Sequence, residues 1–255
     1  MKPIAIITGA SSGIGRQFVL QAGEQGRYGE IWAIARSHDA LKETASLCKT
    51  PVRVLPIDLA KQDGIKAVAD LLTKERPSIG LLVNAAGLGK FGPVNGQTPD
   101  EISQMIKLNI HALTLLTRAA LPFMAEGGQI LQIASTASFQ PLPDMAVYAA
   151  SKAYVLSFSR ALAKEAKRFG VSVTAVCPGW TSTHFFDVAK QTANPAAVRN
   201  FPFMTRPADV VRKALRDGGR RKEVSVYGVH NHIHRCLAKL LPAGVLESAW
   251  MKLKN

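Results

Sequence analysis

Cysteine is scarce in this sequence: Cys48, Cys177 and Cys236 are three among 255 residues, and none of them forms a Cys-x-x-Cys pair. A disulfide framework or a cysteine-based zinc site needs several closely spaced cysteines. The wide spacing therefore argues against both and predicts no metal site of this type. Three isolated thiols are typical of buried side chains in the reducing cytoplasm, where we expect this protein to work.

Long apolar runs are also missing. No uninterrupted stretch approaches the roughly 20 residues that a membrane-spanning helix requires. The apolar run at residues 4–7 is too short for the core of a signal peptide, and Gly9 and the polar residues after it end it at once. These observations favour a protein without a membrane span or a secretion signal.

Acidic residues are few, and this leaves a large positive charge. The chain has 32 Lys or Arg and 18 Asp or Glu, a net charge of +14, and half of this excess lies between Arg206 and the C-terminus. Such an excess of positive charge can bind nucleic acid, an anionic membrane surface, an acidic carrier or a phosphate-bearing ligand. Because the sequence contains no nucleic-acid-binding module and no basic stripe interleaved with aromatics, we expect no nucleic-acid partner and interpret the charge as solvated basic faces.

Strand-like and helix-like segments alternate along most of the chain. This alternation predicts an α/β protein with a doubly wound parallel sheet of about seven strands and helices on both faces, in a single domain over residues 1–255. The expected strands are residues 4–8, 30–35, 52–57, 79–84, 129–134, 171–177 and 223–227. The expected helices are residues 13–25, 39–48, 63–74, 100–108, 110–125, 147–169 and 207–217.

A glycine-rich turn joins the first strand to the first helix. Gly9, Gly13 and Gly15 form a GxxxGxG pattern, which is one residue longer between its first two glycines than the usual dinucleotide fingerprint. Glycine permits close approach of the backbone, and a helix N-terminus offers unpaired N–H groups to a pyrophosphate. A plain surface turn is the alternative, but the position after a buried strand favours nucleotide binding. The expected cofactor contacts here are Gly9, Ser11, Ser12, Gly13, Ile14 and Gly15.

The end of the second strand distinguishes NAD from NADP. An acidic residue at this place would bind the ribose hydroxyls of NAD and repel a 2′-phosphate. This chain instead has Arg36 and Ser37. An arginine can pair with a phosphate dianion, and a serine can donate a further hydrogen bond. An exposed surface arginine is the alternative, but we favour NADP(H) over NAD(H).

Tyr148 and Lys152 stand four residues apart in a stretch that favours a helix, so they share one helical face. A nearby ammonium favours the phenolate and is expected to lower the tyrosine pKa from about 10, which suits a general acid or base. A tyrosine and a lysine that merely share a helix are the alternative. The remaining motifs of the chain decide between the two.

Together these features resemble the short-chain dehydrogenase/reductase family, with its Rossmann-type fold, over about residues 3–185. The further matches are Asp58 after the third strand, Asn84-Ala85-Ala86-Gly87 at the end of the fourth, Asn109, Ser135 thirteen residues before Tyr148, and Pro178-Gly179 with Thr181 after the sixth. The resemblance implies that Asp58, Asn84, Ala85, Ala86, Gly87, Pro178, Gly179 and Thr181 contact the dinucleotide, together with Tyr148 and Lys152. It also implies a small-molecule carbonyl or alcohol substrate and a homodimer or homotetramer.

The resemblance implies a role for each of four catalytic residues. Tyr148 protonates the carbonyl oxygen while hydride reaches the carbon, and Ser135 hydrogen-bonds that oxygen. Lys152 lowers the tyrosine pKa and holds the ribose, and Asn109 positions a water that links Lys152 to solvent. Ser138 is a competitor for the role of Ser135. A non-catalytic dinucleotide sensor, a basic interaction protein and a tyrosine epimerase or dehydratase are rival functions, and the retained tyrosine–lysine pair and the glycine spacing favour a reductase.

Substrate choice is expected in the loops after the strands, at residues 88–91, 139–143 and 180–204. The aromatic and apolar side chains of the last loop either cover a hydrophobic ketone, such as a 3-ketoacyl or steroid-like ketone, or pack the loop itself: Phe185, Phe186, Phe201, Phe203 and Met204. A basic, apolar extension follows at residues 229–255, with His230, His232 and His234 before a leucine-rich helix. We expect this extension to pack or to oligomerise, with a membrane-surface contact as the less favoured alternative.

Overall fold

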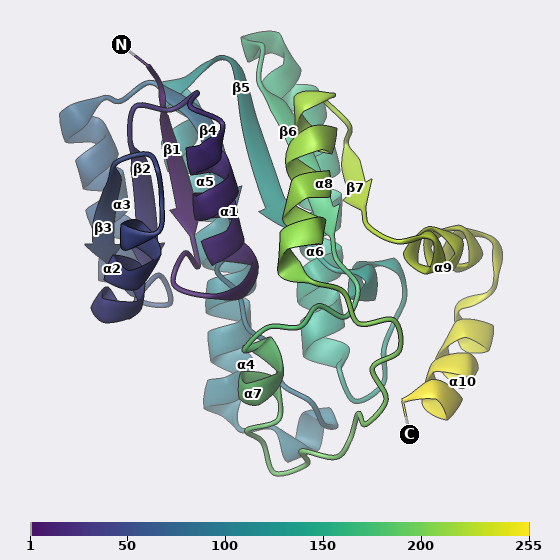
Figure 1. Ribbon diagram of the computed structural model, residues 1–255. Helices are drawn as coiled ribbons and strands as arrows, with labels where there is room; N and C mark the ends of the chain where they lie inside the picture. Colours follow the sequence, from purple (N-terminus) through teal and green to yellow (C-terminus); the bar gives the residue numbers. More distant parts are fainter. Residues whose placement is uncertain (1, 255) are drawn as a thin grey trace.

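The computed structural model describes residues 2–254 and contains one parallel sheet with helices on both faces (Figure 1). The strands are β1 (Ile4–Thr8), β2 (Ile31–Ala35), β3 (Val52–Pro56), β4 (Ile79–Asn84), β5 (Met124–Ile133), β6 (Ser172–Cys177) and β7 (Val224–Val226). Their order is β3-β2-β1-β4-β5-β6-β7, and every neighbouring pair is parallel. The order reverses between β1 and β4, where parallel sheets of this type open a crevice for ligands. The predicted fold class is confirmed.

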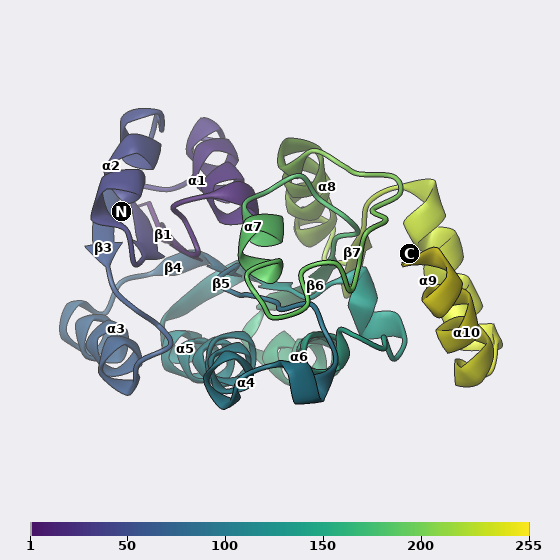
Figure 2. The ribbon, with the colours of Figure 1, turned by 90° about the horizontal axis from the view of Figure 1, so that it is seen from below.

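Two layers of helices cover the sheet. The helices are α1 (Gly13–Glu24), α2 (His38–Ser46), α3 (Gln62–Glu75), α4 (Pro99–Ile106), α5 (Leu113–Ala120), α6 (Ala146–Ala166), α7 (Phe185–Ala189), α8 (Pro207–Gly219), α9 (Val229–Leu240) and α10 (Ala243–Leu253). Figure 2 shows α1, α2 and α8 on one face, and α3, α4, α5 and α6 on the other. This two-sided cover explains why the central strands are apolar at almost every position rather than at every second one.

Two of the apolar clusters of the core lie on opposite faces of the sheet. On the side of α1 and α8, Phe18 and Val211 pack with Ile7 of the first strand. On the other side, the neighbouring Ile6 packs with Leu72 and Leu116 of α3 and α5. Successive strand residues thus enter opposite clusters, which fixes the register of β1 and the position of the glycine turn that follows it.

The segment between β4 and β5 differs from the prediction. The helix expected to reach residue 125 ends at Ala120, and a 3₁₀ turn at Leu121–Phe123 leads directly into β5. Pro122 has no N–H to donate, which explains why the α-helix stops here and the strand begins earlier than expected. A π-helical segment at Lys107–Ala112 joins α4 to α5, so the two expected helices are continuous.

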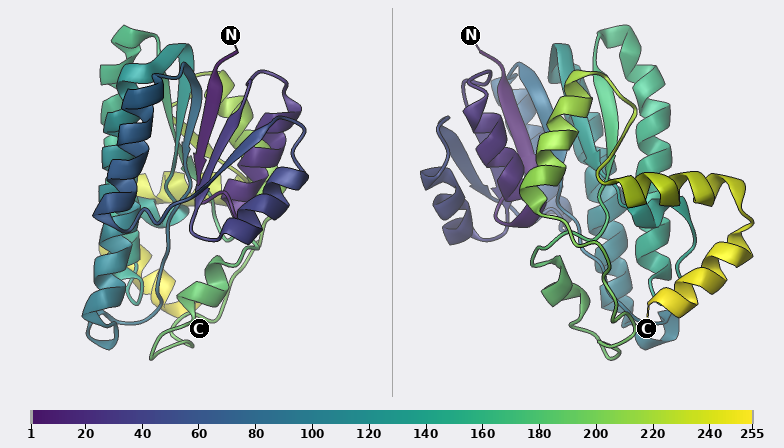
Figure 3. Two further views of the ribbon diagram at one scale, coloured as in Figure 1. Left: turned by 90° about the vertical axis from the view of Figure 1, so that its left-hand side faces the viewer. Right: turned by 45° about the vertical axis from the view of Figure 1, so that its right-hand side comes forward.

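The C-terminal extension forms two helices, α9 and α10, which leave the edge of the sheet after β7 and fold back toward the substrate loop (Figure 3). The indole Nε1 of Trp250 donates a hydrogen bond to the Pro143 carbonyl (2.9 Å). The ammonium of Lys254 pairs with Asp144, and the Arg199 amide donates to the Lys254 carbonyl. The extension therefore packs on its own chain. Among residues 2–254, no helix combines the length and the apolar character needed to cross a membrane.

Candidate active site

A cavity of about 1370 Å³ opens at the carboxyl ends of the strands. The loops that follow β1 through β6 contribute to its lining, as do α9 and α10. The volume exceeds the range of about 300–1,000 Å³ that is typical for one small ligand. The cavity therefore has room for a dinucleotide and a second molecule.

The glycine turn lies at the bottom of this cavity. Gly9, Ser11, Ser12, Gly13, Ile14 and Gly15 all line it. Gly9 and Gly13 have positive φ angles of 66° and 52°. A Cβ on Gly15 would lie 2.1 Å from the Gly9 carbonyl oxygen, so only glycine permits this packing. Because the Ser12 side chain does not cap α1, the first N–H groups of the helix remain available to an anion.

Arg36 and Ser37 lie beside this turn at the end of β2 and line the cavity. Arg36 is exposed, and no other side chain of residues 2–254 forms an ion pair or a hydrogen bond with its guanidinium. The Ser37 oxygen accepts a hydrogen bond from the Ala40 amide, which leaves its own O–H free to donate. Asp58 also lines the cavity, and one carboxylate oxygen accepts from the Ala60 amide (3.0 Å). The donor set therefore fits a phosphorylated ribose.

The structure corrects the role of Asn84. Its side chain turns into the interior, where the amide donates to Thr117 and to Gln132 (3.0 Å each), and the residue does not line the cavity. Ala85, Ala86 and Gly87 do line it. The asparagine is the last residue of β4, so its side chain points into the helix layer, while the three residues after the strand meet the cavity.

Thr8 is a residue that sequence reasoning missed. It is buried at the end of β1, and its hydroxyl oxygen accepts hydrogen bonds from the amides of Ala85 and Ala86 (3.0 Å each). These bonds join the loop after β4 to the glycine turn that follows Thr8. The sequence offered one indication of this role, which is the position of Thr8 directly before the first glycine of the turn. At the end of a central parallel strand, the loops after neighbouring strands lie close together.

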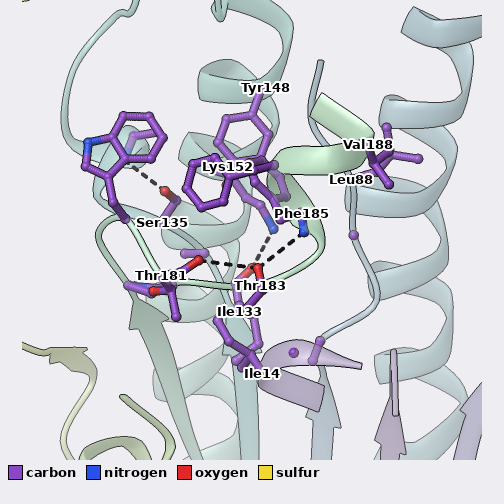
Figure 4. Close-up of a pocket in the computed structure, with 18 of the residues that line it drawn as sticks. Ile14, Leu88, Ile133, Ser135, Tyr148, Lys152, Thr181, Thr183, Phe185 and Val188 are labelled. Carbon is purple, nitrogen blue, oxygen red and sulfur yellow. Dashed lines mark hydrogen bonds between the residues drawn. The ribbon is translucent and has the colours of Figure 1, made fainter. Parts of the chain in front are cut away.

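Tyr148 and Ser135 meet on the wall of the cavity (Figure 4). Tyr148 lies on the first turn of α6, and Ser135 follows β5. Ser138, the competitor, does not line the cavity, because its hydroxyl donates to the Ser135 carbonyl and faces the Cys177 thiol. The geometry thus favours Ser135 as the residue that faces a ligand.

Lys152 lies one turn after Tyr148, with its Nζ 5.8 Å from the centre of the phenol ring. Its ammonium donates to the Ile133 carbonyl (2.8 Å). Burial lowers the pKa of Lys152 to about 8 and raises the pKa of Tyr148 to about 12, and the Ser135 side chain opposes the latter shift. The sequence-based expectation that the tyrosine pKa is lowered was therefore wrong for the protein without a ligand. Burial disfavours the charged form of both groups, so it raises the pKa of the tyrosine and lowers the pKa of the lysine.

Asn109 is fully buried in the π-helical segment. Its amide binds both backbone groups of Leu88, at 2.9 Å to the N–H and 2.8 Å to the carbonyl, and it also donates to Ser151 (3.0 Å). Ser151 in turn donates to the Tyr148 carbonyl (2.7 Å). Asn109 therefore connects the loop after β4 to the first turn of α6. A π-segment inside a helix is frequent at functional sites.

Pro178, Gly179 and Thr181 line the cavity after β6, as expected. The Thr181 hydroxyl donates to the Gly179 carbonyl (3.0 Å). A Cβ on Gly179 would lie 2.6 Å from the amide nitrogen of Asn231, so the first turn of α9 packs directly on this loop. The C-terminal extension therefore contacts the site, which sequence reasoning did not anticipate.

The aromatic side chains of the substrate loop divide between the two expected roles. Phe186 and Phe201 pack with Trp180, which stacks at 6.4 Å on Trp250 of α10, so these rings form the core of the loop. Phe185 instead lies 5.4 Å from the Tyr148 ring and covers it (Figure 4). Phe203 and Met204 are exposed.

The three histidines of the extension lie within α9 and take different environments. His230 stacks on Phe203, and His234 hydrogen-bonds the Gln140 side chain (2.8 Å), while His232 is exposed. No group of three or more potential metal ligands occurs within residues 2–254. Helical geometry explains the separation, because alternate residues lie on different faces of a helix.

Similarity to known proteins identifies the family. Residues 3–194 match the short chain dehydrogenase family. An uncharacterized oxidoreductase of Staphylococcus epidermidis is 31% identical over 182 residues, which are 71% of this chain and 78% of that protein. The very-long-chain 3-oxoacyl-CoA reductase of Rattus norvegicus is 29% identical and covers 89% of this chain, with 72% of its own length matched.

Solved structures agree with this family. A short-chain dehydrogenase of Sphingobium yanoikuyae in complex with NADPH has a TM-score of 0.79 and 30% identity, over 98% of this chain and 94% of that one. A bulky-bulky ketone specific alcohol dehydrogenase of Comamonas testosteroni has a TM-score of 0.75 and 29% identity, over 93% of each chain. The chain belongs to the short-chain dehydrogenase family and is an NAD(P)-dependent oxidoreductase.

Proposed function

We propose that this short-chain dehydrogenase uses NADPH to reduce a lipophilic ketone to a secondary alcohol, with Tyr148 as the proton donor. The observation that carries the proposal is the meeting of Tyr148, Ser135 and Lys152 in one cavity with the glycine turn. Substrate loop residues 180–204 cover the same cavity. We also propose that the protein forms a homodimer or homotetramer, which a mass measurement in solution tests.

The choice of NADPH rests on the residues at the end of β2. Arg36 offers a guanidinium that no other side chain of the described residues neutralises, and no carboxylate stands beside it at the strand end to repel a 2′-phosphate. The unpaired N–H groups of α1 would hold the pyrophosphate, and Lys152 would hold the nicotinamide ribose. NADPH supplies a hydride to the carbonyl carbon when it is bound. The NADPH complex of the Sphingobium yanoikuyae relative supports this choice.

The proton chemistry follows from the buried pair. With a pKa near 12, the Tyr148 phenol keeps its proton at neutral pH and can give it to a carbonyl oxygen that gains negative charge. Ser135 beside it donates a hydrogen bond to the same oxygen. Lys152, with a pKa near 8, can return a proton toward the phenolate, and Asn109 holds the helix that carries both residues. The protonated Tyr148 is the form that reduction of a ketone requires.

The apolar lining supports a lipophilic substrate. Phe185 covers the Tyr148 ring, and Leu142 and Met145 line the cavity nearby. Two relatives are similar to this chain over most of its length, one named for very-long-chain 3-oxoacyl-CoA and the other for bulky-bulky ketones. Both names fit a large apolar site better than a sugar site.

A ketone panel tests the proposed reaction. We expect NADPH oxidation at 340 nm with alkyl and aryl ketones and little with sugars or polyols; activity confined to sugars or polyols would refute the substrate class. Tyr148→Phe should lower kcat by about 10²–10⁴-fold while NADPH still binds, measured by cofactor fluorescence. Retained turnover in this variant would refute the role of Tyr148. NADPH binding without turnover of any carbonyl by the wild-type protein would indicate a dinucleotide sensor instead.

A further inference from the structure

One end of the catalytic cavity is walled by the two C-terminal helices. The apolar side chains of this wall are Ile233 and Leu237 of α9 and Leu246, Ala249, Trp250 and Leu253 of α10, and the polar residues His230, Asn231 and His234 of α9 line the same cavity. We call this part of the cavity the tail groove. Residues three or four apart share a face of a helix, so the α9 pair and the α10 set each form one stripe. Both stripes face the same cavity as Tyr148.

The apolar stripe of α9 is not what attaches this helix to the protein. Ile233 is 54% exposed and Leu237 43% exposed, whereas Asn231 is buried and His234 half-buried. Asn231 packs on Gly179, and His234 hydrogen-bonds Gln140. A surface helix normally buries its apolar stripe and exposes its polar one. On α9 the two apolar side chains of the cavity wall are left exposed, so they are available to a ligand.

We propose that the tail groove binds the alkyl chain of the substrate whose carbonyl is reduced at Tyr148. This inference rests on the proposed function and adds the chemical class of the substrate: a carbonyl compound with a long, unbranched hydrocarbon chain. We identify the occupant as part of the substrate because the groove and the catalytic side chains line one continuous cavity. A molecule held at Tyr148 therefore reaches the groove without crossing bulk solvent.

Anchoring of α10 makes the groove a preformed site. The Trp250 indole is bonded to the Pro143 carbonyl, and the Lys254 ammonium is paired with Asp144. Pro143 and Asp144 lie five and four residues before Tyr148, so the groove wall is attached to the segment that leads into the catalytic tyrosine. A site that is formed before binding loses little affinity to ordering.

The dimensions of the groove set the expected chain-length dependence. From Leu246 to Leu253, α10 presents its stripe over about 10 Å at 1.5 Å per residue. Each methylene that moves from water into such a surface should raise kcat/KM by about fourfold. The increase should continue with each added carbon until the chain passes the end of the groove, and then stop.

The test is a series of straight-chain methyl ketones from butanone to dodecanone, assayed with NADPH on the full-length protein. Leu237→Gln should flatten the rise of kcat/KM with chain length. Ala249→Phe, which fills the groove, should shorten the chain length at which the rise stops. Leu240→Gln is the matched control, because Leu240 lies on the same helix and is 80% exposed but does not line the cavity.

The outcomes separate the two proposals. If no ketone is reduced, the proposed function fails. If short ketones are reduced but kcat/KM does not rise with chain length in the wild-type protein, the tail groove proposal alone is overturned. Equal effects of Leu237→Gln and Leu240→Gln would also overturn it. A change of mass in solution caused by Leu237→Gln, with the chain-length dependence intact, would assign the stripe to a contact between subunits and overturn the proposal as well.

Discussion

Arg36 offers the sharpest test of cofactor choice. Its guanidinium lies at the end of β2 on the rim of the cavity, exposed and without a partner side chain among residues 2–254. Arg16 on the neighbouring helix is different, because its guanidinium is already paired with Glu43 at 2.7 Å. Arg36 is therefore the cation at this strand end that is free to bind a 2′-phosphate.

The magnitude follows from the strength of hydrogen bonds to charged groups, about 1.5–3 kcal/mol each. Losing one such interaction should lower kcat/KM for NADPH by about 10–150-fold in Arg36→Met and leave kcat/KM for NADH nearly unchanged, since NADH has no phosphate at this place. Arg36→Asp adds repulsion between a carboxylate and a phosphate dianion. It should reverse the preference, because a carboxylate at this position can also accept hydrogen bonds from the ribose hydroxyls of NADH.

The assay compares initial rates with NADPH and NADH at one ketone concentration and at two ionic strengths. Salt should reduce the effect of Arg36→Asp, because the site is exposed and its charges are screened. Lys42→Asp is the matched control: it makes the same change of charge on α2, but Lys42 does not line the cavity. If the NADPH/NADH ratio is the same in wild-type protein and Arg36→Asp, or if Lys42→Asp changes it equally, the reasoning is wrong.

Three further predictions concern the turn, the buried lysine and the C-terminal anchor. Gly15→Ala should abolish dinucleotide binding in a fluorescence titration, because the new methyl group would lie 2.1 Å from the Gly9 carbonyl oxygen; retained binding would contradict this packing. Burial lowers the pKa of Lys152 from its usual 10.5 to about 8, so the unfolded chain binds more protons between these values and stability rises with pH there. Lys152→Met should remove this rise and add roughly 3 kcal/mol to the free energy of unfolding at neutral pH, measured by urea denaturation. A variant less stable than wild type would refute this burial penalty. Asp144→Asn breaks the ion pair with Lys254 and should lower the free energy of unfolding by about 1–2 kcal/mol. It should also raise KM for a long ketone but not for NADPH. If the variant and the wild-type protein have equal KM values for the ketone, this ion pair does not support the groove.

The sheet and the cofactor end of the site could be predicted because local patterns determine them. Buried parallel strands are apolar throughout, and a glycine turn after the first of them has few uses other than close approach to a phosphate. The sequence pattern therefore located Gly9, Gly13 and Gly15 in the cavity. The prediction was wrong for Asn84, whose side chain points into the interior, whereas the three residues after it line the cavity. The sequence does not show in which direction a side chain at the end of a strand points.

The contribution of α9 and α10 could not be predicted in the same way. An apolar stripe in a sequence indicates which residues share a face, but not whether that face meets the core, a ligand or a second subunit. The decision depends on contacts between distant residues, such as Asn231 on Gly179 and Trp250 on the Pro143 carbonyl. None of these pairs has a pattern of its own in the sequence.

The tyrosine–lysine pair shows how burial and charge compete within one site. Spacing correctly places Lys152 one helical turn from Tyr148, and charge alone would then favour a phenolate. Burial acts on both groups toward the uncharged form, and it dominates: the phenol holds its proton more tightly and the ammonium less tightly. A buried neutral phenol costs less desolvation than a buried phenolate, so Tyr148 holds its proton at neutral pH. In the proposed reaction, Tyr148 would give up this proton only when a carbonyl oxygen gains negative charge against it, which would tie protonation of the substrate to the arrival of hydride.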